Sequence, residues 1–224
     1  FKFEGSKQPT INNVSFKIPA GQKVALVGKM GSGKSTMSKL IAGMIEPTSG
    51  AILIDGIDVR QIDPADVRKN IGIMLQDSWL FSGTIRENIQ MGFNEYDDEH
   101  VLEICKVAGV DEFVGSHPKG YDLEIKERGV GLSGGQKQTI NLARSLLHKP
   151  EVLLLDEPTS SMDQATEQKV IGALNEFCRH KTMLIVTHRN PILTMVDRIF
   201  VLENGKIISD QTPEQLGIKK VAKQ

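Results

Sequence analysis

The sequence predicts an α/β protein in which helices surround a mainly parallel sheet. Short apolar runs without alternation recur along the chain, as expected for parallel strands that are covered on both faces. Segments with helical spacing lie between several of these runs, and such alternation is typical of a parallel sheet. The runs are Lys23–Val27, Ala51–Ile54, Ile71–Leu75, Val152–Leu155, Met183–Val186 and Ile199–Leu202.

The N-terminal segment differs from this core. Within Asn13–Ile18, the apolar residues Val14, Phe16 and Ile18 alternate with polar ones, which predicts a strand of an antiparallel edge sheet. The first residues also read as a strand, so we expect the chain to be a domain excised from a longer protein. Helical spacing then predicts two core helices, at Lys34–Ile45 and Gln164–Phe177.

The middle of the chain, from about Trp79 to His148, lacks convincing strands. Helical spacing covers Thr84–Ile89, Asp97–Ala108 and Gly134–Leu147, and the second of these begins with three acids, which suit the first turn of a helix. We therefore predict one domain, in which residues 79–148 form a helical subdomain inserted into a core of residues 1–78 and 149–224. The last six residues, 219–224, are expected to be a frayed tail.

Composition limits the functions that this chain can have. The net charge of −1 and the isoelectric point near 6.6 lack the basic excess of a nucleic-acid-binding protein, so we expect no nucleic-acid partner. No apolar stretch approaches the ~18 residues that cross a bilayer, which predicts a soluble, cytoplasmic domain. Cys105 and Cys178 lack metal-site spacing and are expected to be small buried side chains in a reducing compartment.

A phosphate-binding loop follows the first predicted core strand. Residues 28–35 read Gly-Lys-Met-Gly-Ser-Gly-Lys-Ser and match the P-loop pattern, with a strand before and a helix after. The glycines let backbone N–H groups surround phosphate oxygens; Lys34 is expected to reach the β- and γ-phosphates, and the Ser35 hydroxyl to bind Mg²⁺. The expected nucleotide contacts are Gly28, Lys29, Met30, Gly31, Ser32, Gly33, Lys34, Ser35 and Thr36.

Two acids follow the apolar run Val152–Leu155. Ligands of open α/β sheets collect at the carboxyl ends of the strands, where these acids are expected. We assign Asp156 as a ligand of Mg²⁺ and Glu157 as the general base for an attacking water. An isolated acidic pair would more often be a solvated strand end, but the P-loop in the same sheet favours the catalytic interpretation.

A second anion-binding helix start is predicted at Leu132–Gln136. Serine, two glycines and a run of helix formers would direct free N–H groups at an anion. Together with the P-loop and the acids, this segment resembles the LSGGQ signature of the nucleotide-binding domain of an ABC transporter, in family order and spacing over nearly the whole chain. The resemblance implies a P-loop NTPase (RecA-like) core that binds and hydrolyses ATP with Mg²⁺.

The resemblance also implies an active site shared between two copies of the domain. In the family, two subunits form a sandwich with two ATP molecules, and the signature of one subunit contacts the γ-phosphate held by the P-loop of the other. A second copy of this chain is therefore the expected partner. The residues that would serve the partner's ATP are Ser133, Gly134, Gly135 and Gln136.

Four further residues receive roles from the resemblance. His188 corresponds to the switch histidine, which contacts the γ-phosphate and helps to position the water. Gln76 corresponds to the glutamine that joins Mg²⁺ and senses the membrane subunit. Phe3 stands where the family stacks an aromatic ring, more often tyrosine, on adenine, and stacking needs only a ring face. Asp163 ends the D-loop, Ser160–Asp163, and can also be the N-cap of the helix that follows.

Several segments resemble the exporter branch of the family. Trp79–Ile89 is similar to the segment after the glutamine loop of exporters, and Glu127–Gly129 to their loop that touches the membrane domain, although Lys126 replaces the usual glycine. Arg60–Arg68 and Met162 resemble type I secretion ATPases, which export RTX-type toxins and adhesins from Gram-negative bacteria.

This resemblance implies a transmembrane domain in the same polypeptide and a position on the cytoplasmic side of the bacterial inner membrane. It also implies a periplasmic adaptor and an outer-membrane channel as partners of the whole transporter. The alternatives are an exporter of drugs, lipids or peptides such as bacteriocins, and a soluble ABC ATPase of DNA repair or translation. A module that closes on ATP without hydrolysing it also stays open.

Overall fold

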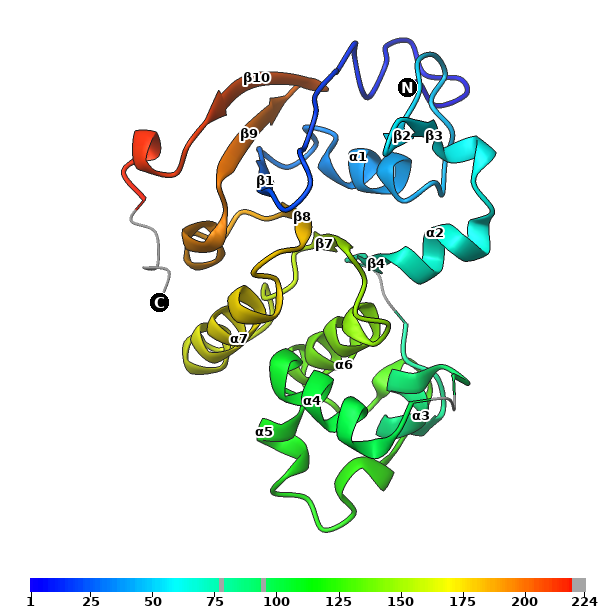
Figure 1. Ribbon diagram of the computed structural model, residues 1–224, viewed down its shortest axis with the longest axis vertical. Coiled ribbons are helices and arrows are strands. Elements are labelled where there is room, and N and C mark those ends of the chain that lie inside the picture. The colour runs from blue at the N-terminus through cyan, green and yellow to red at the C-terminus, as the bar shows by residue number, and fades with distance from the viewer. Residues whose placement is uncertain (77–78, 94–95, 219–224) are drawn as a thin grey trace.

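The computed structural model describes residues 1–76, 79–93 and 96–218, so the predicted tail at 219–224 lies outside the described residues. A sheet of six strands in the order β10-β9-β1-β8-β7-β4 forms the core (Figure 1). All neighbouring strands in it are parallel except β10 and β9, which confirms the predicted α/β class. The strands are β1 Lys23–Val27, β4 Ile71–Met74, β7 Val152–Asp156, β8 Thr182–Val186, β9 Arg198–Glu203 and β10 Lys206–Gln211.

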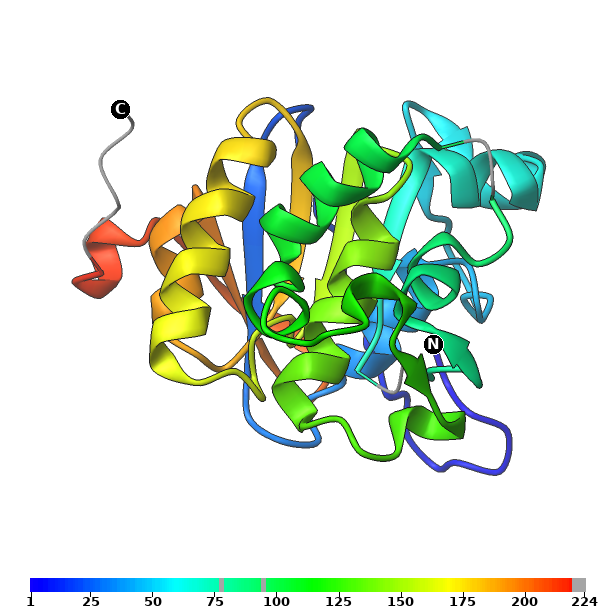
Figure 2. The same cartoon turned by 90° about the horizontal axis from the view of Figure 1, so that it is seen from below.

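Helices cover both faces of this sheet, which explains why its strands are apolar throughout. Figure 2 shows α7, in yellow, and the green helices in front of one face. Successive side chains of a strand point to opposite faces. Leu153 and Leu155 of β7 therefore enter the larger apolar cluster with α4, α6 and α7. Leu154 enters the smaller cluster, with Met37 and Leu40 of α1 on the other face.

The predicted helices are present, and side chains cap several of them. Thr84 and Asp97, predicted as first residues, are the N-caps of α3 and α4, where their oxygens accept from backbone N–H groups. The first helix, α1, ends at Ile41 rather than Ile45, and Gly43 soon after it has a positive φ of 68°. The helices are α1 Lys34–Ile41, α2 Pro64–Asn70, α3 Ile85–Gln90, α4 Asp98–Ala108, α5 Asp111–Val114, α6 Gly134–Leu146 and α7 Gln164–Phe177.

The predicted N-terminal strand is wrong. Residues 1–22, all of which the structure describes, contain no strand. Asn13 has a φ of 53°, a left-handed conformation that interrupts an extended segment. The alternation instead reflects packing: the ring of Phe16 lies 5.2 Å from that of Phe200 in β9. The segment thus covers the sheet with a side chain rather than adding a strand to it.

The prediction of a core strand at Ala51–Ile54 is also wrong in its placement. Only Leu53–Ile54 is a strand, β2, and it pairs with β3, Ile57–Asp58, in an antiparallel hairpin outside the six-stranded sheet. The two residues between the strands, Asp55 and Gly56, have φ values of 49° and 83°, as in the tight turns that favour hairpins. This hairpin and the pair β9–β10 are two antiparallel parts of the fold.

Residues 79–148, apart from 94–95, are mainly helical and occupy the lower part of Figure 1. They also hold a short antiparallel pair that the sequence did not predict, β5 (Gly83–Thr84) with β6 (Glu124–Ile125). Arg144 of α6 joins α3 and the segment before β5 to α6, because its guanidinium donates to the backbone carbonyls of Asn88 and Trp79. Burial lowers the pKa of Arg144 to about 10.

No helix in the described ranges combines the length and the apolar character that crossing a membrane requires.

Candidate functional site

The P-loop joins the carboxyl end of β1 to the first turn of α1, and its backbone leaves no room for side chains at two glycines. A Cβ atom on Gly28 would lie 2.3 Å from the carbonyl oxygen of Leu202. Gly33, the N-cap of α1, has a φ of 106°, a conformation that other residues rarely adopt. The loop can therefore pack against Leu202 and turn into α1 in this way only because these positions carry no Cβ.

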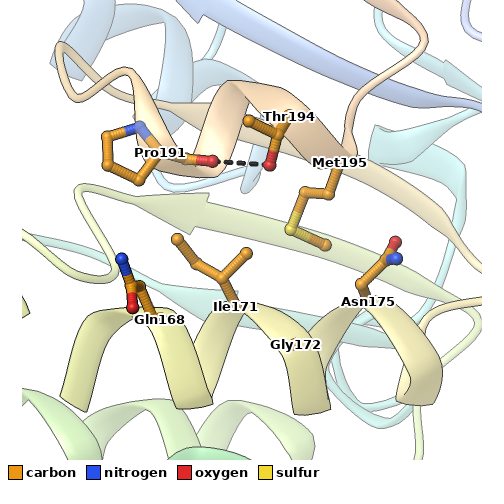
Figure 3. A pocket seen from close by; sticks show the side chains of 7 residues that line it. All are labelled: Gln168, Ile171, Gly172, Asn175, Pro191, Thr194 and Met195. Atoms are coloured by element: carbon orange, nitrogen blue, oxygen red, sulfur yellow. Dashed lines mark hydrogen bonds between the residues drawn. The ribbon is translucent and has the colours of Figure 1, made fainter. Parts of the chain in front are cut away.

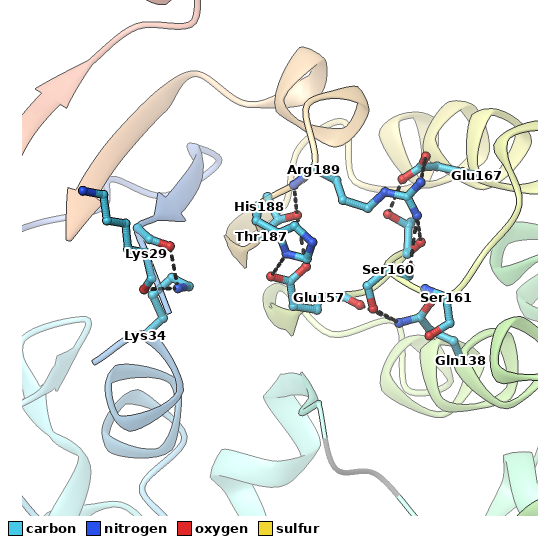
Figure 4. Close-up of polar contacts among 12 residues, drawn as sticks. Lys29, Lys34, Gln138, Glu157, Ser160, Ser161, Glu167, Thr187, His188 and Arg189 are labelled. Carbon is cyan, nitrogen blue, oxygen red and sulfur yellow. Dashed lines mark hydrogen bonds and ion pairs between the residues drawn. The ribbon is translucent and has the colours of Figure 1, made fainter. Parts of the chain in front are cut away.

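The charge of Lys34 lies over this loop. Its Nζ donates to the carbonyl oxygens of Gly28, at 2.7 Å, and Lys29, at 3.0 Å (Figure 4). The first N–H groups of a helix have no acceptor within it, and Gly33 offers α1 no side-chain cap. An ammonium group and unsatisfied N–H groups at one helix end form a site for an anion.

One observation indicates that the loop fits a phosphate group. Within the described residues, the Ser32 hydroxyl is buried and has no hydrogen-bond partner, so it is available to donate to a phosphate oxygen. For a magnesium ion, the Ser35 hydroxyl and the Asp156 carboxylate fit, because Mg²⁺ at phosphate sites takes one or two carboxylates besides phosphate oxygens and waters.

The acids lie at the carboxyl end of β7, as expected. Asp156 is its last residue and is 3% exposed; Glu157 follows and is 8% exposed. Glu157 has a φ of 52°, which for a residue with a Cβ costs roughly 1–2 kcal/mol. Its N–H donates to the carbonyl of Val186 at 2.8 Å. Strain of this kind persists where the surroundings over-determine the conformation, often at functional sites.

The loop after β8 places two polar side chains on the Glu157 carboxylate. His188 Nδ1 lies 2.6 Å from Glu157 Oε1, and the Thr187 hydroxyl donates to Oε2 at 3.4 Å (Figure 4). The histidine is mostly exposed, whereas the carboxylate is mostly buried. This carboxylate is thus oriented from one side and accessible beside the imidazole.

An ion pair between a half-buried arginine and a buried carboxylate lies against the D-loop. Arg189 donates to the carbonyl oxygen of Thr159 at 2.7 Å, and its Nη2 lies 3.1 Å from Oε2 of Glu167, which is 1% exposed. The Thr159 hydroxyl donates to the other oxygen of Glu167 at 2.7 Å. Asp163 caps α7 by accepting from Ala165 and Thr166, and these hydrogen bonds lower its pKa.

The signature forms the predicted helix start at α6. Ser133 is its N-cap in a capping box: its hydroxyl accepts from Gln136 N at 3.2 Å, and Gln136 Oε1 accepts from Ser133 N at 2.9 Å. The N–H groups of Gly134 and Gly135 have no acceptor within the helix. A Cβ on Gly135 would lie 3.0 Å from the carbonyl oxygen of Ser161, so α6 begins directly against the D-loop.

The profile of the family described as ABC transporter matches residues 11–160, well over half of the chain. The chain belongs to the ABC transporter family. It is the ATP-binding domain of that family, an ABC ATPase, with the P-loop NTPase fold.

Similar proteins extend this assignment. The chain is 43% identical over 216 residues to YgaD of Bacillus subtilis, named as a candidate multidrug export ATP-binding/permease protein, with 96% of this chain and 37% of YgaD covered. A Staphylococcus aureus protein with the same description is 42% identical, with 99% of this chain and 38% of that protein covered.

Among solved structures, a bacterial Atm1-family ABC exporter with ATP bound superposes with a TM-score of 0.89 at 36% identity, covering 96% of this chain and 38% of that one. The chain thus spans less than two fifths of the length of these relatives.

In this ABC domain, the structure brings together some of the predicted site residues and leaves others apart. Glu157 contacts His188, and the side chain of Gln138 in α6 bonds to both Glu157 and Ser160 of the D-loop. Gln76 is exposed beyond β4, the strand beside β7. The ring of Phe3 is half-exposed and packs edge-on against Phe1 at 4.7 Å. Met30 is fully exposed at the P-loop.

Sequence reasoning missed the residues that position this site, above all Gln138, Glu167 and Arg189. A signal for Glu167 does exist. It lies on the apolar face of α7 with Val170 and Leu174, where an acid needs a buried partner. Nothing in the sequence pattern indicates that Arg189 is that partner.

Two hollows of the ABC domain lie outside the P-loop. One, of about 360 Å³, lies between α7 and the turn at Pro191–Met195 (Figure 3). None of its lining side chains titrates near neutral pH; they are Gln168, Ile171, Gly172, Asn175, Pro191, Thr194 and Met195. The other, of about 460 Å³, adjoins the signature at Leu132 and Gln136. The contact between Glu157 and His188 lies at the sheet edge, and neither residue lines either hollow.

Proposed function

We propose that this domain hydrolyses ATP to drive export through a transmembrane domain of the same longer protein, on the cytoplasmic side of a bacterial membrane. The names of similar proteins combine ATP-binding and permease parts, and the chain covers only 37% and 38% of two of them. The structural neighbour is an exporter with ATP bound. A soluble repair or translation factor receives no comparable support.

The observation that carries the catalytic proposal is the contact of Glu157 with His188 at the sheet edge that also holds the P-loop. β1, which leads into the P-loop, is parallel to β8, and β8 is parallel to β7, so their carboxyl ends lie at one edge. ATP held by residues 28–36 would place its γ-phosphate there. Glu157 would then accept a proton from the attacking water, and His188 would orient the carboxylate and contact the phosphate.

Mg²⁺ fits beside the nucleotide. Ser35, Asp156 and Gln76 would hold the ion, which neutralises charge on the phosphates when bound. Lys34 would exchange its hydrogen bonds with Gly28 and Lys29 for phosphate oxygens. Phe3, half-exposed, would stack on adenine.

The active site is proposed to be shared by two copies of the chain. Ser133–Gln136 form an exposed or half-exposed helix start with two unsatisfied glycine N–H groups, which is a second anion site in a domain that already has one. In a two-fold dimer the signature of each copy would complete the site at the partner's P-loop. The two copies would close on ATP and separate after hydrolysis, because the ligand that favours the closed state is then gone.

An apolar surface beside the loop at Glu127–Gly129 fits the proposed contact with the transmembrane domain. Trp79 and Phe81 are about half exposed, and Val130 more than half. The guanidinium of Arg128 lies 4.3 Å from the centre of the Trp79 ring, which fixes the indole at this surface.

Among cargoes, the names of the similar proteins favour multidrug export. The expectation of type I secretion rests on Arg60–Arg68 and Met162 alone and gains no support from those names. The periplasmic adaptor and the outer-membrane channel depend on that same expectation. We therefore propose multidrug export first and protein secretion second.

Phosphate release by the chain, measured with MgATP from dilute to concentrated protein, tests the proposal. A rate that rises with the square of protein concentration supports a hydrolytic dimer, and a module that only binds ATP would release no phosphate. Glu157→Gln should still bind MgATP, lose nearly all turnover and accumulate an ATP-bound dimer in size-exclusion chromatography. Turnover at the parent rate would show that Glu157 is not the base.

A further inference from the structure

Gln138 links the signature helix to the catalytic glutamate of the same chain. It lies on α6, two residues after the signature. Its Nε2 donates to the backbone carbonyl of Glu157 at 2.6 Å and to the Ser160 hydroxyl at 3.0 Å (Figure 4). Its Oε1 accepts from the N–H of Ser161 at 2.8 Å. One amide side chain therefore contacts the catalytic residue and the D-loop at once.

These bonds fix the backbone that aims the Glu157 carboxylate. The N–H of Glu157 is held by Val186 of β8, and its carbonyl accepts from Gln138 of α6 at 2.6 Å and from the N–H of Ser160 at 3.3 Å. Between these bonds the backbone has a φ of 52°, a left-handed conformation that is intrinsically disfavoured in a residue with a Cβ. The shorter of the two bonds to the carbonyl comes from α6, so the position of α6 relative to the sheet contributes to the direction of the carboxylate.

The same helix carries the signature at its first residues. Gly135 lies so close to the D-loop that a Cβ would meet the Ser161 carbonyl at 3.0 Å. Ser133 and Gln138 belong to one regular helix of 13 residues with its N-cap, so a shift at its start carries Gln138 with it. An anion bound at the signature would therefore act on the Glu157 carbonyl through the hydrogen bond from Gln138.

We propose that Gln138 is a positioning residue that couples occupancy of the signature to the orientation of Glu157 in the same chain. The proposal rests on the shared site proposed above, because the signature serves the ATP held by the partner while Glu157 serves the ATP of its own P-loop. Gln138 would then connect the two sites of the dimer. Hydrolysis at one site would depend on ATP at the other.

Two substitutions at Gln138 separate its two hydrogen-bonding functions. Gln138→Glu keeps an acceptor for Ser161 N–H but places an ionised oxygen, which cannot donate, against the Glu157 carbonyl. Gln138→Met has a side chain of similar length that supplies neither the donor for the Glu157 carbonyl nor the acceptor for Ser161 N–H. Gln168→Glu and Gln168→Met, at an exposed position of α7, are the matched controls.

Both Gln138 variants should lower kcat at least about tenfold, equivalent to about 1.4 kcal/mol. The Hill coefficient for ATP should fall toward 1, while MgATP affinity in the Glu157→Gln background stays within about twofold. The urea midpoint should stay near that of the parent, as in the Gln168 controls. The proposal would be overturned if Gln138→Met kept the parent kcat and the parent Hill coefficient. If Gln138→Met does not fold, the same result with Gln138→Glu would overturn it.

A measurement without a Gln138 variant completes the test. In Glu157→Gln, amide hydrogen exchange of residues 157–161 should slow when the ATP-bound dimer forms, and unchanged exchange would contradict the coupling. If the parent shows neither second-order hydrolysis nor an ATP-bound dimer, the shared site itself is wrong. If the parent shows both and the Gln138 variants behave like it, only the role of Gln138 is wrong.

Discussion

The Nδ1 atom of His188 lies 2.6 Å from Oε1 of Glu157, across the carboxyl ends of two adjacent parallel strands. The two residues are 31 positions apart in the chain and meet because β7 and β8 end side by side. The contact leaves other lone pairs of the carboxylate for a water, since an ionised carboxylate accepts about four hydrogen bonds.

His188→Ala should lower phosphate release at least about 100-fold, in the range typical of a lost acid–base or orienting group. MgATP binding, followed by a fluorescent ATP analogue, should change little because the P-loop is intact. His180→Ala is the control, since His180 is exposed and precedes β8 at the other end of that strand. Equal activity of the two variants would contradict the role assigned to His188.

Lys34→Ala should weaken MgATP binding at least about tenfold, because a charged hydrogen bond to phosphate contributes roughly 1.5–3 kcal/mol. Lys39→Ala removes an equal charge from the last turn of the same helix, at an exposed position. Isothermal titration calorimetry on both variants checks the expectation. If Lys39→Ala weakens binding as much as Lys34→Ala, then net charge and not the P-loop contact is responsible.

Arg189→Met should destabilise the fold by about 2–4 kcal/mol, because it leaves the carboxylate of Glu167 buried without its cation. Arg179→Met breaks an exposed ion pair with Glu176 and should cost less than about 1 kcal/mol. Urea unfolding of the two variants gives the comparison. A difference below about 0.5 kcal/mol between them would show that the Arg189–Glu167 pair does not stabilise the D-loop.

Cys105 and Cys178 should resist alkylation in the folded protein. Burial raises the pKa of each thiol to about 12, and both cysteines are free and buried. At pH 8 the reactive thiolate is then about one part in ten thousand, and it would appear only as the pH approaches 12. Intact-mass measurement after iodoacetamide treatment should show no adduct in buffer and two in urea. Rapid labelling in buffer would contradict the burial.

Local signals explain why most helices could be predicted from the sequence. The bounds of α7, Gln164–Phe177, agree with the prediction because Asp163 caps its start and apolar residues recur with helical spacing. The capping box of Ser133 and Gln136 likewise lies within four residues. Such features depend on neighbours in the chain and are readable before any tertiary contact forms.

Strand placement could be predicted less well, because pairing depends on distant residues. Asn13–Ile18 has the alternation of a strand but packs Phe16 on Phe200 without a ladder. Leu53–Ile54 has a strand's composition but pairs only with its own hairpin partner. The edge strand β10 was not predicted at all, although it pairs with β9. β-Propensity reflects packing against neighbours as much as the residue itself.

The sequence by itself determined the chemistry of this protein: the P-loop, the acids after β7, the signature helix start and the family to which they belong. Each of these is a contiguous segment whose backbone and side chains act locally. Only the tertiary structure decided how the site is held. The hydrogen bonds of Gln138 with Glu157, and of Arg189 with Thr159, join residues 19 and 30 positions apart. A hydrogen bond needs two atoms within about 3 Å, and only the packing of helices on the sheet brings these atoms together.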